Sequence, residues 1–310
     1  MDIGERIKGA AAARRRFPLH GWIGVALALL FWVINWSLSG PRTHLGFFPM
    51  WLGYCLAVDG AVLSRTGTSL LSRSVRRYVG LFVLSAPMWW IFELLNLRTQ
   101  NWVYEGAAQF SPGVYFLLTT VSFTTVLPAV LESAELLASF DFLKRPKQGP
   151  MIGVRRRTVL AFFLTGWIML ALLLLWPKTF FLFVWVSLYF ITEPINIWLG
   201  NRSLTEWTRD GDWRPVLALW LGILLTAFFW EMWNYLSYPK WVYHVAWGNW
   251  LHVFEMPLLG YGGYLPFSLE LYALYHLACG LLGEKHPDYI RIAPEAGRPE
   301  RHTPASKPVK

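Results

Sequence analysis

The sequence predicts an all-α integral membrane protein of about eight transmembrane helices, arranged as two four-helix repeats that share one orientation in the membrane. Three observations predict this fold. Of the 310 residues, 55% are hydrophobic and only 15% are charged, a composition typical of membrane proteins. Several apolar stretches reach about twenty residues, enough at 1.5 Å per residue to cross a hydrocarbon core of about 30 Å. A set of polar and aromatic residues also recurs once in each half of the chain.

The expected spans are apolar stretches bounded by polar or basic segments. In order, they are 18–39, 45–64, 78–98, 113–137, 158–176, 179–199, 215–237 and 264–283. Strands with open edges are excluded because unpaired backbone groups cannot be left in lipid, and the stretches lack the alternation of barrel strands. Helices are therefore the expected spanning elements.

The repeat is defined by residues that recur at a constant offset. The pairs are Glu93 and Glu231, Asn96 and Asn234, Pro128 and Pro266, and Glu132 and Glu270, each 138 positions apart, with the triplets Trp102-Val103-Tyr104 and Trp241-Val242-Tyr243 between them. Upstream, Trp51 and Asp59 match Trp185 and Glu193 at an offset of 134. A duplicated fold is the simplest cause. Because each copy has an even number of spans, the halves are expected to be related by an axis along the membrane normal.

Basic residues predict the orientation, because lysine and arginine concentrate in cytoplasmic loops. An internal N-terminus places all of the 28 except Arg42, Arg98, Lys178 and Lys240 on the cytoplasmic side. The expected segments are a basic cytoplasmic N-terminus (1–17), a first repeat (18–142), a basic cytoplasmic linker (143–157), a second repeat (158–283) and a disordered cytoplasmic tail (284–310). The chain is thus expected to be a multi-pass protein of the cell membrane. The net charge of +9 then reflects topology and attraction to anionic headgroups at the cytoplasmic face, and no nucleic-acid partner is expected.

Acidic residues inside the spans are the main functional signal, because a carboxylate at the centre of a spanning helix costs roughly 2.5–3.5 kcal/mol. The candidates are Asp59, Glu93, Glu132, Glu135, Glu193, Glu231 and Glu270. Glu93 and Glu231 are expected in an outer layer, where Asn96 and Asn234 share their helix faces and can orient the carboxyl groups. Asp59, Glu193, Glu132 and Glu270 are expected nearer the cytoplasm. Such acids can clamp helices together, or they can form a protonatable pair in a central cavity.

The outer segment before the last span is rich in aromatic residues and too interrupted to cross the membrane. It can form an aromatic belt, or it can wall a lipid site whose ring faces stabilise positive charge. His244, His252 and Glu255 raise the question of a metal, since His252 and Glu255 would share a helix face. The first half has no histidine in the equivalent segment, so neither a metal nor another cofactor is expected.

The order of an acid, a Trp-x-Tyr motif and a proline shortly before a glutamate resembles the repeat unit of the lycopene cyclase domain family, duplicated membrane proteins that cyclise carotenoid ends by protonation. It is similar more loosely to the membrane-embedded terpene cyclases. The resemblance covers about a third of the chain. It implies acid–base roles for Glu93, Glu231, Glu132 and Glu270. The substrate-binding residues expected beside them are Asn96, Asn234, Trp102, Tyr104, Trp241 and Tyr243.

Three functions are compatible with these patterns. A cofactor-independent isoprenoid or carotenoid cyclase or isomerase would use one buried carboxyl to protonate an alkene, aromatic faces to stabilise the carbocation, and a second acid to take the final proton. A proton-coupled carrier or lipid-binding protein would instead rock its halves around a midplane site. An envelope scaffold or assembly protein would use its aromatic loops to dock a partner.

Overall fold

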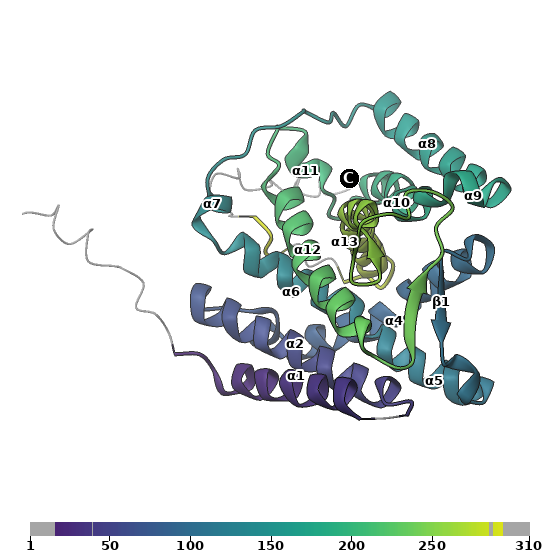
Figure 1. The fold of residues 1–310 in the computed structure, drawn as a ribbon. Helices are drawn as coiled ribbons and strands as arrows, with labels where there is room; N and C mark the ends of the chain where they lie inside the picture. Colours follow the sequence, from purple (N-terminus) through teal and green to yellow (C-terminus); the bar gives the residue numbers. More distant parts are fainter. Residues whose placement is uncertain (1–15, 39, 285–287, 294–310) are drawn as a thin grey trace, which may run out of the picture.

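The computed structural model describes residues 16–38, 40–284 and 288–293, and helices make up 72% of it (Figure 1). Six spans are long and apolar enough to cross a membrane. They are α1 (Leu19–Ser37), α2 (Thr43–Thr66), α4 (Val75–Thr99), α5 (Pro112–Phe123) continued by α6 (Val126–Ala138), α8 (Arg156–Leu175) and α12 (Arg214–Tyr235). A seventh span is present if one bent segment is counted as a single span. This segment bends by 42° and consists of α9 (Pro177–Phe180), η2 (Phe181–Trp185) and α10 (Ser187–Leu199). The predicted all-α, multi-pass architecture is confirmed at this level.

The helix α13 (Tyr261–Leu281) covers the last predicted span but is not among the six most apolar ones. Figure 1 shows it near the middle of the bundle, and every residue from Glu270 to His276 is buried. A helix that is covered by protein on all sides needs no lipid-compatible face, so it can carry polar side chains such as those of Glu270 and His276.

Small residues let several helices approach closely. A Cβ atom added to Gly24 of α1 would lie 2.5 Å from the backbone nitrogen of Ala57 in α2. A Cβ added to Gly222 of α12 would lie 2.5 Å from the backbone nitrogen of Ala134 in α6. Since lipid is as apolar as the helix faces, such close backbone packing is a main source of helix association in membranes.

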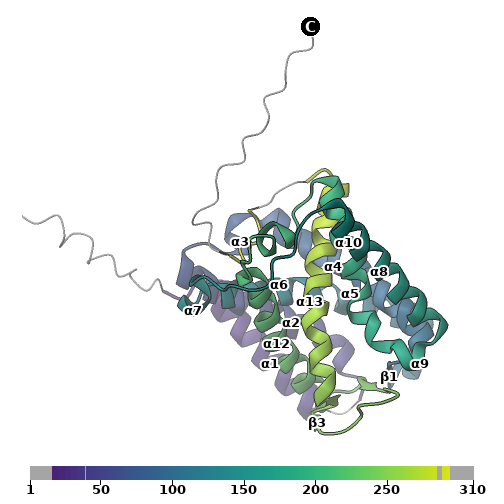
Figure 2. The same ribbon diagram turned by 90° about the horizontal axis from the view of Figure 1, so that it is seen from above.

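Three short helices lie at one end of the bundle: α3 (Leu70–Arg73), α7 (Asp141–Lys144) and α11 (Thr205–Thr208). Figure 2 shows α3 and α7 at the end opposite β1 and β3. Asp59 accepts hydrogen bonds from Ser69 Oγ (2.8 Å) and Leu71 N (2.9 Å) at the start of α3, and Glu193 accepts from Thr205 N (2.8 Å) and Oγ1 (2.6 Å) at the start of α11. These two buried acids therefore cap helices, satisfying N–H groups that have no partner within the helix.

The opposite end carries a two-stranded antiparallel ribbon that joins the two halves of the chain. β1 (Trp102–Glu105) pairs with β2 (Lys240–Tyr243), so that Trp102 faces Tyr243, Val103 faces Val242 and Tyr104 faces Trp241. Nearby are the hairpin of β3 (His252–Val253) and β4 (Met256–Pro257) and the short helices η1 (Ala107–Gln109) and η3 (Leu258–Gly260). The ribbon lies outside the apolar helices, where strands are not restricted by lipid.

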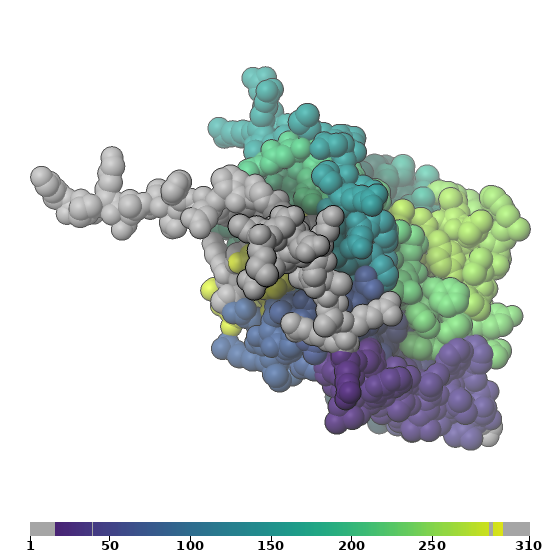
Figure 3. Space-filling model, turned by 90° about the vertical axis from the view of Figure 1, so that its left-hand side faces the viewer, coloured from purple at the N-terminus to yellow at the C-terminus, as the bar shows by residue number. Residues whose placement is uncertain are grey.

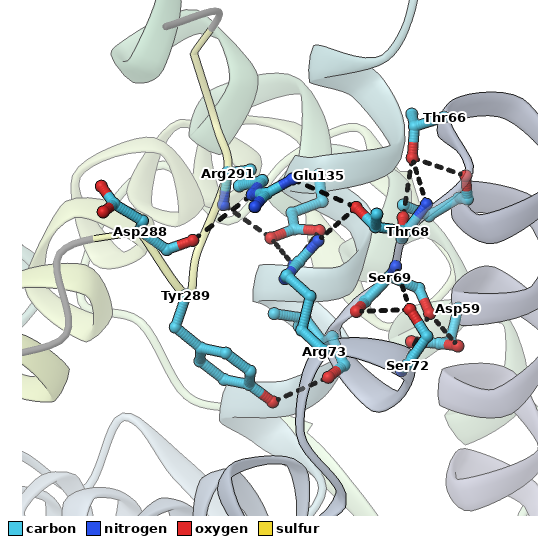
Figure 4. A network of polar contacts seen from close by, with 12 residues as sticks. Asp59, Thr66, Thr68, Ser69, Ser72, Arg73, Glu135, Asp288, Tyr289 and Arg291 are labelled. Carbon is cyan, nitrogen blue, oxygen red and sulfur yellow. Dashed lines mark hydrogen bonds and ion pairs between the residues drawn. The ribbon is translucent and has the colours of Figure 1, made fainter.

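The described part of the tail packs against the end of the bundle that carries α3. Tyr289, Ile290 and Ile292 are buried, and Tyr289 donates a hydrogen bond to Leu70 O at 3.1 Å (Figure 4). Figure 3 shows this segment, in yellow, next to blue residues of the first half. Residues 288–293 are thus fixed by apolar packing, unlike the disorder predicted for 284–310. The other tail residues from 285 on, and the basic N-terminus up to residue 15, lie outside the described residues.

A buried ion pair also fixes this segment. Arg73 donates to Glu135 at 2.5 and 2.7 Å, and the backbone N–H of Arg291 donates to the same carboxylate at 2.6 Å (Figure 4). Glu135, predicted as a buried acid, therefore has its charge compensated by Arg73 and accepts a further hydrogen bond from the tail backbone.

Candidate functional site

A cavity of about 140 Å³ lies at the ribbon end of the bundle, with walls from both halves of the chain. This volume is well above what a single water molecule needs, so the cavity can admit part of an organic ligand. Its aromatic wall includes five indoles, those of Trp89, Trp102, Trp185, Trp230 and Trp241, and three phenols, those of Tyr104, Tyr243 and Tyr264. The wall is therefore suited to an apolar ligand.

Glu93, near the end of α4, is held by donors from the wall of the first half. Its Oε1 atom accepts hydrogen bonds from Trp89 Nε1 (2.8 Å), Trp102 Nε1 (3.1 Å) and Tyr104 OH (2.5 Å). The side chains of Trp102 and Tyr104 belong to β1, which begins three residues after α4 ends at Thr99. The structure thus joins Glu93 and this Trp-x-Tyr motif in one hydrogen-bonded group.

Glu231, near the end of α12, occupies the corresponding place in the second half. It is fully buried, and its Oε1 atom accepts from Tyr243 OH (2.7 Å) and Tyr264 OH (2.5 Å). Trp241 Nε1 donates to Tyr243 OH at 2.9 Å and extends the network. The Oε2 atom of Glu231 has no hydrogen-bond partner in the part of the chain that the structure describes.

The strand tyrosines are hydrogen-bond donors at neutral pH. Burial, and then the adjacent glutamate, raises the pKa of Tyr104 and of Tyr243 well above the usual value for a phenol. Tyr104 and Tyr243 line the cavity, whereas Glu93 and Glu231 are not among its described lining residues. The two carboxyl groups thus lie one layer behind the wall, and the phenols connect them to the cavity.

The two asparagines do not orient the glutamates as the spacing of three suggested. Asn96 Nδ2 donates to Trp102 O (2.8 Å), and its Oδ1 accepts from Asn101 N (2.9 Å) and Trp102 N (3.3 Å). Asn234 Nδ2 donates to Trp241 O (2.7 Å), and its Oδ1 accepts from Trp241 N (2.9 Å). Each side-chain amide bonds to backbone groups of the segment where the chain reverses direction after its helix. An amide can do this because it has both an N–H donor for a peptide carbonyl and an oxygen acceptor for a peptide N–H. Their predicted substrate-binding role is replaced by fixing the ribbon tryptophans.

Glu132 and Glu270 lie elsewhere. Both are fully buried, and neither is among the described residues that line the cavity. Glu270 accepts a hydrogen bond from Leu188 N (2.9 Å) at the bend that starts α10, while the two carboxyl oxygens of Glu132 have no partner among the described residues. The structure therefore separates these two acids from the cavity, and Glu270 supports a broken helix.

The residues considered for a metal have other partners. His252 Nε2 lies 2.9 Å from Asn249 Oδ1, and Glu255 forms an ion pair with Lys240. The backbone N–H of His244 donates to Asn101 O at 2.7 Å. Within residues 16–38, 40–284 and 288–293, no three His, Cys, Asp or Glu side chains are grouped as metal ligands would be.

Several wall residues were not singled out as site residues from the sequence. Trp185 stacks on Trp102 with ring centroids 5.5 Å apart, and its match to Trp51 at an offset of 134 was the available signal. Tyr264 donates to Glu231, but the matching position 138 residues earlier is Val126, so the repeat gave no sign of it. Asn101, His44 and Lys240 also line the cavity and belong to no motif.

No protein-family model, curated protein or solved structure matches this chain.

Proposed function

We propose that the chain is a tandem duplication of a four-helix unit, with α13 and the bent α9–α10 segment as spans, so that eight segments cross the membrane. Three matched sets of contacts support it. The ribbon pairs each motif with its own copy around Val103 and Val242. The two asparagines fix equivalent tryptophans. Phe92 packs on Trp185 at 5.9 Å, and the residues at the matching offsets, Trp230 and Trp51, pack at 5.4 Å.

The proposed orientation places the α3, α7 and α11 end in the cytoplasm of a cell-membrane protein and the ribbon end outside. The basic residues support it, because Arg73, Arg76, Lys144 and Arg209 lie in or beside those three short helices. The opposite side carries few basic residues, Arg42, Arg98, Lys178 and Lys240. Because the rule counts lysine and arginine and not net charge, this asymmetry favours the proposed orientation.

For the activity, we propose acid–base chemistry on an isoprenoid-type lipid that enters the aromatic cavity. The observation that carries this proposal is the pair of buried carboxyl groups, Glu93 and Glu231, each hydrogen-bonded to phenols of the cavity wall. No cofactor is needed for proton transfer to an alkene if a carboxylic acid supplies the proton and indole faces stabilise the cation.

When Glu231 is neutral, its O–H donates to the Tyr264 oxygen, which reverses the hydrogen bond between them. Tyr264 then gives its hydroxyl proton to an alkene carbon and receives the proton of Glu231, so that the alkene π pair becomes a C–H bond and leaves a carbocation. A second alkene of the ligand attacks the cation in a cyclisation. Tyr104 then takes a proton from the neighbouring carbon while passing its own to Glu93, and the C–H pair becomes a new double bond. The ligand is isomerised without net gain or loss of atoms, and the cycle closes when Glu93 releases one proton to water and Glu231 takes up one proton from water.

The test is the lipid content of cells that express the chain or the variant Glu231→Gln. Glutamine keeps the size of the side chain and its acceptor oxygen but cannot release a proton, so the rearranged isoprenoid should disappear while the folded yield is unchanged. Glu105→Gln is the matched control, because Glu105 is an exposed acid of the ribbon and is not among the described residues that line the cavity. Full product formation by the Glu231 variant would reject the mechanism.

A carrier or lipid-binding function without chemistry is the second candidate. The position of Glu93 and Glu231 behind the wall favours it, because a ligand in the cavity contacts phenols and indoles before it reaches a carboxyl group. Purified protein reconstituted with a pH gradient separates the two functions. Lipid or proton flux with unchanged lipid chemistry would favour the carrier.

A further inference from the structure

The cavity wall contains a fixed amide with an unused donor. Asn101 is only 5% exposed and lines the cavity, and its Nδ2 atom has no hydrogen-bond partner among the described residues. The backbone of Asn101 is held on both sides, because its N–H donates to Asn96 Oδ1 (2.9 Å) and its carbonyl accepts from His244 N (2.7 Å). The backbone that carries the amide is therefore fixed, and a buried donor without an acceptor is unfavourable unless a ligand or a water molecule supplies one.

A second wall nitrogen is in the same situation. His44 Nε2 is buried without a partner in the described part of the chain, and the imidazole ring is flanked by Phe110 and Tyr115 at centroid distances of 4.8 and 5.4 Å. Other polar wall groups are already used within the protein. Thr43 Oγ1, for example, accepts from Tyr238 N at 2.8 Å, and the Tyr104 hydroxyl donates to Glu93.

The charge of the wall restricts the ligand further. Lys240 is the one lysine, arginine or acidic residue among the described lining residues, and its ammonium is paired with Glu255. A phosphate or carboxylate in the cavity would meet no unpaired lysine or arginine there, and burying an uncompensated charge is costly. A neutral hydroxyl or carbonyl oxygen can accept from an amide without this cost.

We propose that the cavity is a binding site for an isoprenoid-type lipid that ends in an uncharged oxygen, and that the Asn101 amide donates a hydrogen bond to this oxygen. The inference rests on the lipid ligand of the proposed function and adds the chemistry of its polar end. The cavity holds this end of the lipid and the part of the chain next to it. The rest of a longer chain lies outside it.

The experiment measures binding of three probes to the purified full chain by tryptophan fluorescence, which is sensitive here because five indoles line the cavity. The probes are farnesol, farnesene (a hydrocarbon of the same carbon number) and farnesyl phosphate. The wild-type chain should bind farnesol roughly 5- to 100-fold more tightly than farnesene, as expected for one buried hydrogen bond. Farnesyl phosphate should bind more weakly than farnesol.

The variant Asn101→Leu should bind farnesol and farnesene equally, with farnesene affinity unchanged. Asn101→Ala, which removes the whole amide without adding a larger apolar group, should also lose the preference and serves if the leucine variant does not fold. Asn249→Leu, an exposed asparagine of the same end, should behave as wild type.

Equal binding of farnesol and farnesene by the wild-type chain would overturn this inference and leave the lipid proposal standing. Tighter binding of the phosphate would overturn the neutral end group. Failure of all three probes to bind would overturn the inference and the proposed function together.

Discussion

Replacing the two motif asparagines tests whether they are structural or contact a ligand. Asn96→Leu removes three hydrogen bonds to the backbone of Asn101 and Trp102, and Asn234→Leu removes two to Trp241. At about 0.5–1.5 kcal/mol net for each bond, the free energy of unfolding should fall by about 2–4 kcal/mol for Asn96 and about 1–3 kcal/mol for Asn234.

The assay is thermal unfolding in detergent, followed by near-ultraviolet circular dichroism, which reports on the packing of the ribbon tryptophans. The midpoint should fall by several degrees for both variants, and more for Asn96. Asn249→Leu is the control, because Asn249 is exposed and bonds to His252. Unchanged midpoints for both variants, together with weakened lipid binding, would refute the structural role and restore the ligand contact predicted from sequence.

Two further predictions concern the packing of the bundle. Gly222→Ala places a methyl group 2.5 Å from the backbone of α6, so α6 and α12 must move apart. The monodisperse fraction on size exclusion should therefore fall sharply. Gly80→Ala, whose new atom has nothing within 4 Å, should leave that fraction unchanged. Arg73→Leu leaves the buried carboxylate of Glu135 without its cation and should cost about 3–5 kcal/mol in urea unfolding, whereas Arg76→Leu, whose side chain is 87% exposed, should change stability by less than about 1 kcal/mol. Equal effects of the glycine pair or of the arginine pair would contradict the packing described.

The fold class was accessible from sequence because lipid imposes simple rules. Apolar stretches of sufficient length had to be helices, and those of α1, α2, α4, α8 and α12 were recognised on that ground. The stretch of α13 was recognised on the same ground, although this helix lies near the middle of the bundle and carries polar residues. The ribbon was not foreseen. The pairing of β1 with β2 depends on how the two halves of the chain pack together, and this packing cannot be predicted from the pattern of residues along one helix.

The site was accessible only in part, for a related reason. Glu93, Trp102 and Tyr104 were recognised as one motif in the sequence, and the structure joins them by hydrogen bonds that the motif alone did not specify. Asn96 was misread because a spacing of three on a helix suggested a partner on the same face, while the helix ends at Thr99 and the chain then offers its own peptide groups. Cavity residues from other elements required the packing of the whole bundle.

Photolabelling tests most directly the claim that the two halves together enclose a lipid-binding cavity. A farnesol analogue with a diazirine at its hydroxyl end, irradiated with the purified chain and mapped by peptide mass spectrometry, should label both the peptide containing Trp102 and Tyr104 and the peptide containing Trp241 and Tyr243, with loss of both labels in excess farnesol. Labelling confined to the lipid-exposed helices α1 and α8, or to one half of the ribbon, would contradict the account.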